Sequence, residues 1–154
     1  LYLVKASTVD SLVFEYDTLV VRDGLTLQIA PSDLQKVSIT MDGKTTEITS
    51  ADSEALTTIA NGINNLKAFD YASYHLAAQD LANTDLTTDT RITFQADLTV
   101  NGEKKSLTIY VGTYADPNRT YRYVQLDGSD MIMVVDNTAV LDLLNGMVPE
   151  KDLE

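Results

Sequence analysis

Alternation of apolar and polar positions is the dominant pattern along this chain, and it predicts strands joined in hairpins. In the clearest run, Ile92, Phe94 and Leu98 alternate with polar side chains. Asn101-Gly102 follows that run, and Asp42-Gly43 separates two earlier ones. Both dipeptides favour type I′ turns, because those turns need positive φ at both central residues. The pattern predicts six strands, over residues 36–41, 45–49, 91–100, 105–111, 120–126 and 131–135.

Two helices are predicted where apolar positions recur every three or four residues. Leu56, Ile59 and Ile63 share one face of a helix over residues 53–67, which Gly62 should weaken by about 1 kcal/mol relative to Ala. Asn137-Thr138 should cap a second helix over 138–145, with Gly146 at its C-terminal end. Between these regions we expect an extended segment from Asp70 to Leu76, then a short helix near 77–81 and a polar loop.

Hairpin-linked strands punctuated by single helices indicate an α+β fold. We expect an antiparallel sheet built from hairpins, with helices packed on one face.

The two ends of the chain resemble each other. Leu1–Val4 followed by Val9 and Leu12 repeats the pattern of Met131–Val135 followed by Val140 and Leu143, at an offset of about 130 residues. This echo indicates a duplicated domain. We therefore expect residues 1–29 to be the end of a preceding repeat, docked as a strand and helix on a complete domain over residues 30–154.

Charge narrows the classes of partner. Eleven Lys and Arg against 23 Asp and Glu give a net charge of −12, which disfavours nucleic acid and anionic lipid. The one basic pair, Lys104-Lys105, fits a solvated hairpin tip. No apolar run approaches the roughly 20 residues of a membrane span. We therefore expect no direct membrane insertion by this segment, and any anchor to lie outside it.

Catalytic groups are scarce in the sequence. The chain has no cysteine and a single histidine, His75, so it has no cysteine nucleophile and cannot form a multi-histidine zinc site. Any histidine-based catalytic triad would have to use His75. His75 beside Asp70 or Asp80 could act as a general base, but a structural or surface role is the simpler hypothesis. The sequence predicts no catalytic residue and no cofactor, although a hydrolase using two of its many carboxylates stays an alternative.

Two acidic clusters could supply oxygen ligands for calcium. Neither has the spacing of an EF-hand loop, and both contain residues that tight turns and helix caps need anyway. We therefore expect no metal site at either cluster, Asp127, Asp130 and Asp136 or Asn83, Asp85 and Asp89.

Tyrosine and arginine side chains gather around the loop at residues 112–119. Such enrichment is typical of recognition surfaces, although tyrosines also pack across strands with their hydroxyls in water. The candidate ligand-binding residues, for a glycan or a peptide, are Tyr110, Tyr114, Arg119, Tyr121 and Tyr123.

The turn and strand patterns resemble the DUF4340 domain family of uncharacterised bacterial proteins. The resemblance lies in three segments, Pro31–Lys44, Asn101–Gly112 and Tyr121–Asp130, and covers roughly residues 30–147. The chain departs from the family in having no Trp after the first hairpin. It also has Leu81–Leu86 where the family tends to carry Tyr-Gly-Leu.

Members of this family resemble membrane-anchored envelope proteins that are often associated with ABC-type export or gliding-motility systems. The resemblance implies a non-enzymatic, extracytoplasmic accessory module with protein partners in the cell envelope, ABC transporter subunits among them. It supplies no catalytic residues. A glycan- or peptide-binding domain is the alternative function, and a carboxylate hydrolase the third.

Overall fold

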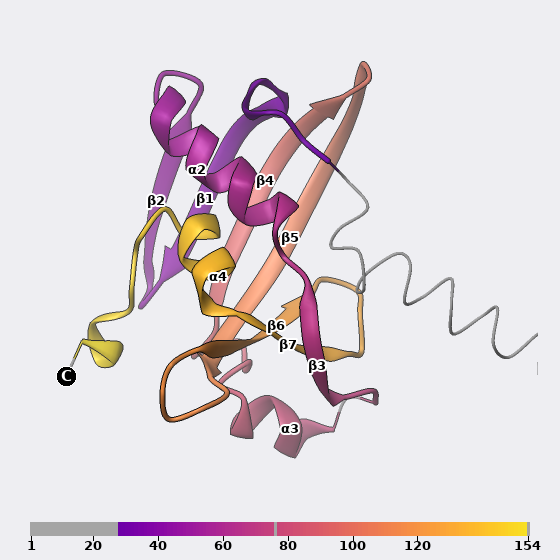
Figure 1. Ribbon diagram of the computed structural model, residues 1–154, viewed down its shortest axis with the longest axis vertical. Coiled ribbons are helices and arrows are strands. Elements are labelled where there is room, and N and C mark those ends of the chain that lie inside the picture. Colours follow the sequence, from indigo (N-terminus) through magenta and orange to yellow (C-terminus); the bar gives the residue numbers. More distant parts are fainter. Residues whose placement is uncertain (1–27, 76, 154) are drawn as a thin grey trace, which may run out of the picture.

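In the part of the chain that the structure describes, a seven-stranded antiparallel sheet with helices forms the domain, so the expected α+β fold is confirmed (Figure 1). The computed structural model describes residues 28–75 and 77–153. The strand order is β2-β1-β4-β5-β6-β7-β3. The strands are β1 (Leu34–Met41), β2 (Lys44–Thr49), β3 (Ala68–Ser73), β4 (Ile92–Val100), β5 (Glu103–Tyr114), β6 (Tyr121–Leu126) and β7 (Ile132–Asp136). The helices are η1 (Pro31–Asp33), α2 (Ser53–Asn64), α3 (Ala78–Asn83), α4 (Asn137–Leu143) and η2 (Glu150–Asp152).

The two predicted tight hairpins are present, and all six predicted strands form. Asp42 and Gly43 have φ of 51° and 74°, and Asn101 and Gly102 have 52° and 80°, as type I′ turns require. The strand ends differ from the predicted ones by up to three residues, most at β5, which continues to Tyr114.

Helices α2 and α4 cover one face of the sheet, here called the helix face (Figure 1). The core between them includes Ile59, Ile63, Phe94 and Leu143, each fully buried. Gly62 lies where the two helices touch, because a Cβ there would stand 2.3 Å from the backbone nitrogen of Leu143. Gly62 therefore does more than weaken its own helix, because the absence of a side chain at this position lets α4 pack closely against α2.

Both main helices end or begin differently from the sequence prediction. α2 stops at Asn64, three residues before the predicted end, and the Asn64 side chain bonds both backbone groups of Ile29 at 2.9 Å. At α4 the capping side chain is that of Asp136, not of Asn137 or Thr138. Its Oδ1 accepts a hydrogen bond from the Thr138 amide at 2.7 Å.

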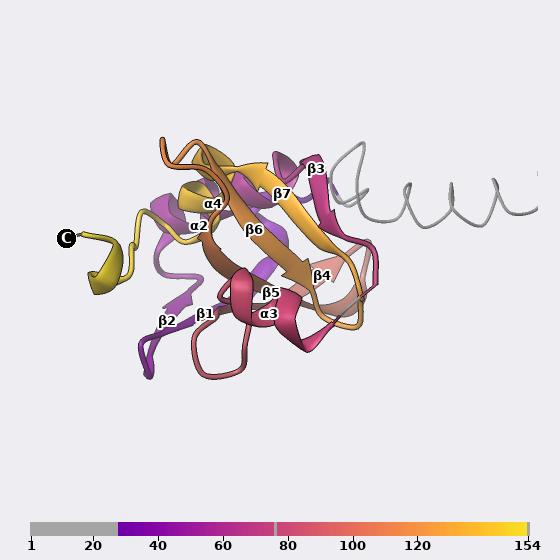
Figure 2. The same ribbon diagram turned by 90° about the horizontal axis from the view of Figure 1, so that it is seen from below.

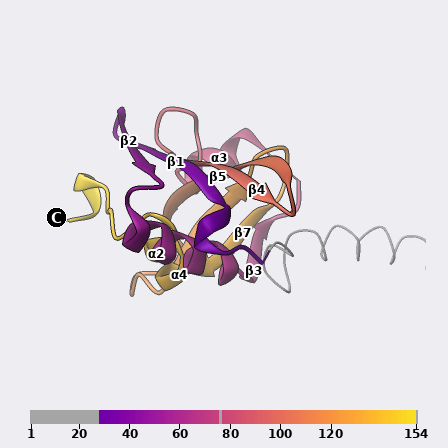
Figure 3. The ribbon, with the colours of Figure 1, turned by 90° about the horizontal axis from the view of Figure 1, so that it is seen from above.

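The segment expected to be merely extended is strand β3, the last strand at one edge of the sheet, paired with β7. α3 follows it and lies on the side of the sheet opposite α2 and α4, here called the outer face (Figures 2 and 3). The loop after α3 packs against β5, where a Cβ on Gly112 would stand 2.0 Å from the Thr84 carbonyl oxygen. A glycine is required at that contact.

The predicted N-terminal strand and helix, including Tyr2, Val4, Val9 and Leu12, lie outside the described residues. Within the described part of the chain, no helix has the length and apolar character needed to cross a membrane.

Candidate functional site

The sheet distributes the four tyrosines among the predicted ligand-binding residues over both of its faces, and the fifth residue, Arg119, lies in the loop between β5 and β6. Tyr110 pairs across strands with Gln125, so Tyr110, Tyr121 and Tyr123 face outward. A bulge between Val111 and Tyr114 shifts the alternation, and Tyr114 pairs instead with the inward-facing Arg122. Tyr110 and Tyr121 are about four residues apart along the sheet, or roughly 13 Å. The five residues therefore do not form one pocket.

Tyr110 is held in an arrangement of its own. Its hydroxyl donates a hydrogen bond to Asp127 Oδ1 at 2.6 Å, and the Arg91 guanidinium lies 3.6 Å from the ring centroid. The hydrogen bond to Asp127 is the main cause of a raised pKa for Tyr110, and burial adds to it. Tyr110 is thus a neutral donor whose hydroxyl is already engaged.

Half-buried Tyr114 and exposed Arg119 are both engaged in contacts within the domain. The guanidinium groups of Arg122 and Arg119 lie 4.5 and 5.2 Å from the Tyr114 ring centroid. Arg119 Nη1 also donates to the backbone oxygen of Asp152 at 2.6 Å. These contacts fix the C-terminal residues on the sheet, which is a structural role.

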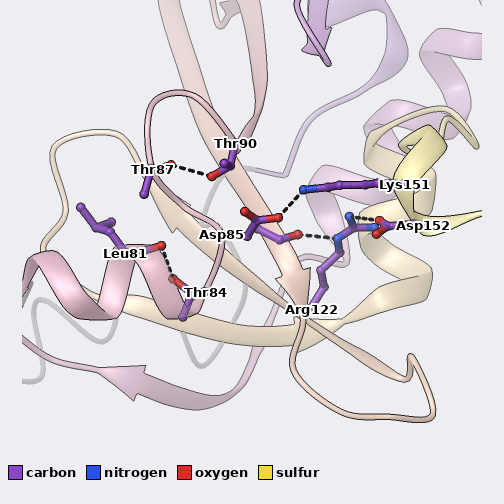
Figure 4. Close-up of polar contacts among 9 residues, drawn as sticks. Leu81, Thr84, Asp85, Thr87, Thr90, Arg122, Lys151 and Asp152 are labelled. Carbon is purple, nitrogen blue, oxygen red and sulfur yellow. Dashed lines mark hydrogen bonds and ion pairs between the residues drawn. The ribbon is translucent and has the colours of Figure 1, made fainter.

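Arg122 is the largest buried polar side chain and was not among the predicted site residues. Its guanidinium donates to Asp152 Oδ2 at 2.7 Å (Figure 4). It also donates to the Gly112 carbonyl at 2.7 Å, and Arg122 is only 1% exposed. Nη1 is buried without a hydrogen-bond partner among the described residues. A charge this deeply buried is tolerated because Asp152 neutralises it.

A second ion pair lies beside the first. Lys151 binds Asp85, which follows α3, and both side chains are partly exposed (Figure 4). The backbone oxygen of Thr84 accepts a hydrogen bond from the Thr113 amide at 2.9 Å. We call η2 together with these two ion pairs the C-terminal clasp. It joins the C-terminal segment to β6 and to the loop after α3.

The most exposed aromatic surface is at the β3 edge of the sheet. The rings of Phe69 and Tyr121 are stacked, with centroids 4.5 Å apart and an interplanar angle of 20°. Phe69 is nevertheless 69% exposed. Asp116 Oδ1 accepts the Tyr121 amide hydrogen at 2.8 Å, and this bond is the main cause of a lowered Asp116 pKa. Of the predicted residues, Tyr121 therefore lies beside exposed Phe69 on this aromatic surface.

The carboxylates near His75 hold other groups. Asp70 Oδ1 accepts the Tyr71 amide hydrogen at 2.8 Å, and Asp80 Oδ2 accepts the Ser73 hydroxyl at 3.1 Å. His75 is exposed, and its backbone oxygen accepts a second bond from that hydroxyl at 2.8 Å. These contacts give Asp70, in β3, and Asp80, in α3, roles in local backbone and side-chain structure.

The acidic clusters are likewise occupied by structural contacts. Asp127 holds Tyr110, Asp136 caps α4 and Asp85 pairs with Lys151. Among residues 28–75 and 77–153, no three His, Cys, Asp or Glu side chains gather as metal ligands would.

Two features of this region were missed from the sequence. Phe69 lies in a segment with little alternation, so it carried no strand signal. Arg122 occupies an inward position of a predicted strand, and a charged residue at such a position, between Tyr121 and Tyr123, could have indicated a buried ion pair.

Comparison with known proteins gives a family and no function. A search of the curated proteins and a search of the solved structures found no match to the chain. A family model described as a domain of unknown function, DUF4340, matches residues 47–147. That span includes strands β3 to β7, the last three residues of β2 and both helices of the helix face. The chain belongs to the DUF4340 family.

Proposed function

We propose that this domain is a non-enzymatic interaction module that docks a protein partner in the cell envelope. The observation that carries the proposal is the stacked pair of Phe69 and Tyr121, because a phenylalanine that is 69% exposed gains little stability for its own domain. Aromatic side chains are enriched among the residues that dominate binding energy at protein interfaces.

The extracytoplasmic location, a membrane anchor outside this segment and ABC transporter subunits as partners belong to the same proposal. Their support is the family resemblance. The two carboxylates considered beside His75, Asp70 and Asp80, accept hydrogen bonds from a backbone amide and a hydroxyl, which favours a binding role over a hydrolytic one.

Site-specific photocrosslinking tests the proposed surface. A photoreactive phenylalanine at position 69 should form a discrete crosslinked product in envelope membranes of the producing cell, whereas the same group in place of exposed Glu103 should not. Tyr121→Ala should reduce the yield at position 69, because Phe69 would lose its stacking partner. Equal products from both positions, or none, would contradict the proposal.

Glycan binding is the second candidate, since an exposed aromatic face can stack on a sugar ring. A glycan array separates the two functions. Binding of one glycan class that is lost in Phe69→Ala supports the glycan function. Crosslinking to a protein without glycan binding supports the first.

A further inference from the structure

The two edges of the sheet differ in how they are protected. The pairing of β3 with β7 is interrupted twice, between Ala68 and Asp70 and between Tyr71 and Ser73. β2 pairs with β1 over six consecutive residue pairs without interruption, and among the described residues it has a strand on one side only. Bulges prevent an edge from accepting another strand. β2 is therefore the edge at which this sheet can be extended.

The hairpin geometry shows which peptide groups of β2 point outward. With a type I′ loop at Asp42-Gly43, Met41 and Lys44 form a hydrogen-bonded pair, and the bonded pairs alternate from there. The backbone groups of Thr45 and Glu47 then point away from β1. Further along, Asp52 Oδ2 accepts the Thr49 amide hydrogen at 3.3 Å, so Thr45 and Glu47 supply the open donors.

A small pocket lies beside this edge on the helix face. Its volume is about 190 Å³, and Met41 and Thr46 line it together with Met147 and Val148 of the C-terminal segment. Sites for small molecules usually measure roughly 300–1,000 Å³, so a single side chain is the better match. A residue placed beside Thr46 in an added strand would point to this same face.

Charge indicates the kind of strand that would be added. The chain carries a net charge of −12. Around β2 and its pocket three acidic side chains, Asp42, Glu47 and Glu150, outnumber two basic ones, Lys36 and Lys44, which pair with Glu47 and Glu150 on the exposed surface. A basic segment would be attracted to this edge, and an acidic one repelled.

We propose that β2 accepts an extended, basic segment of a partner protein as an additional strand, with an apolar side chain of that segment in the pocket beside Thr46. Main-chain hydrogen bonds to Thr45 and Glu47 supply part of the affinity, and the pocket supplies selectivity. This surface is separate from the one around Phe69, at the opposite edge of the sheet.

The first test uses a fluorescein-labelled synthetic peptide in which Lys and Thr alternate with Val. Fluorescence anisotropy should show saturable binding that weakens several-fold between about 0.05 and 0.5 M NaCl, because salt screens the attraction. In hydrogen exchange followed by NMR, the bound peptide should slow exchange of the Thr45 and Glu47 amides at least tenfold. Absence of both binding and amide protection would overturn the proposal.

A matched pair of variants locates the binding. Glu47→Pro removes the outward amide, and proline is tolerated at edge positions whose N–H faces solvent. Glu47→Gln removes the same charge but keeps the amide. We expect the proline variant to bind the peptide at least tenfold more weakly than the glutamine variant, while circular dichroism shows both folded. Equal affinities would overturn the proposal.

Two further variants keep the test decisive if Glu47→Pro does not fold. Val148→Trp should fill the pocket and weaken the peptide at least tenfold, and Phe69→Ala should leave its affinity unchanged. Unchanged binding in Val148→Trp would overturn the proposal. Loss of binding in Phe69→Ala alone would also overturn it, and would assign the peptide to the aromatic surface.

Discussion

Gly62 has two opposing effects on the free energy of unfolding. Replacing it with Ala should stabilise α2 by up to about 1 kcal/mol through helix propensity. The new Cβ would stand 2.3 Å from the Leu143 backbone, however, and forcing the helices apart typically costs roughly 1–3 kcal/mol. We expect Gly62→Ala to lower stability in urea denaturation, whereas Ala at the exposed neighbour Asn61 should be neutral or stabilising. A stabilised Gly62→Ala variant would show that the contact relaxes freely.

The bond from Tyr121 to Asp116 predicts a pH dependence. Because the pKa of Asp116 lies below its ordinary value of 3.8, its ionised form stabilises the folded state above that value. This stabilisation is lost as the pH falls through the lowered pKa. The free-energy difference between the wild type and Asp116→Asn, measured by urea denaturation, should therefore shrink from pH 7 to pH 3. A constant difference would contradict the assignment.

The buried ion pair of Arg122 and Asp152 predicts that replacing Asp152 strongly lowers the free energy of unfolding. Asp152→Ala leaves a buried guanidinium without its counter-charge, which typically costs about 3–5 kcal/mol. Lys151→Ala removes the neighbouring, partly exposed ion pair, which is worth up to about 1 kcal/mol. Chemical denaturation of both variants should show this contrast. Similar losses would mean that Asp152 is dispensable to Arg122.

At the level of elements, local patterns predicted most of the strands because each is paired with a sequence neighbour through a short turn. β3 lacked such a signal. Its partner β7 is far along the chain, and its two bulges break the alternation that identifies a strand. The bulge in β5 likewise placed Tyr114 on the helix face, so a sequence cluster of tyrosines became two separate sets. A bulge is fixed by tertiary pairing, which periodicity does not reveal.

The contacts of Asp127, in the turn before β7, and of Asp136, at the start of α4, predict that the domain has no tight calcium site. Asp127 holds Tyr110 and Asp136 holds the Thr138 amide, so binding calcium there would break contacts already made. We expect isothermal titration calorimetry to detect no submicromolar calcium site. Tight binding that disappears in Asp127→Asn would contradict this expectation.

For the whole molecule, the C-terminal clasp extends the folding unit beyond the span that the family model matches. That match ends at residue 147, whereas Lys151 and Asp152 bind groups on the loop after α3 and on β6. Ending the chain after Met147 should expose the Arg122 guanidinium and leave its charge unpaired. We expect the melting temperature to fall by on the order of 10 °C.

A second substitution separates the lost charge from the lost packing. In the shortened chain, Arg122→Met removes the unpaired charge while keeping most of the side-chain volume, and such replacements of buried ion pairs are often neutral or stabilising. Part of the lost melting temperature should therefore return, by several degrees. The same substitution in the full-length chain leaves Asp152 without its arginine and should not stabilise it. If Arg122→Met gave no recovery in the shortened chain, packing of the C-terminal segment, and not neutralisation of Arg122, would be its main contribution to stability.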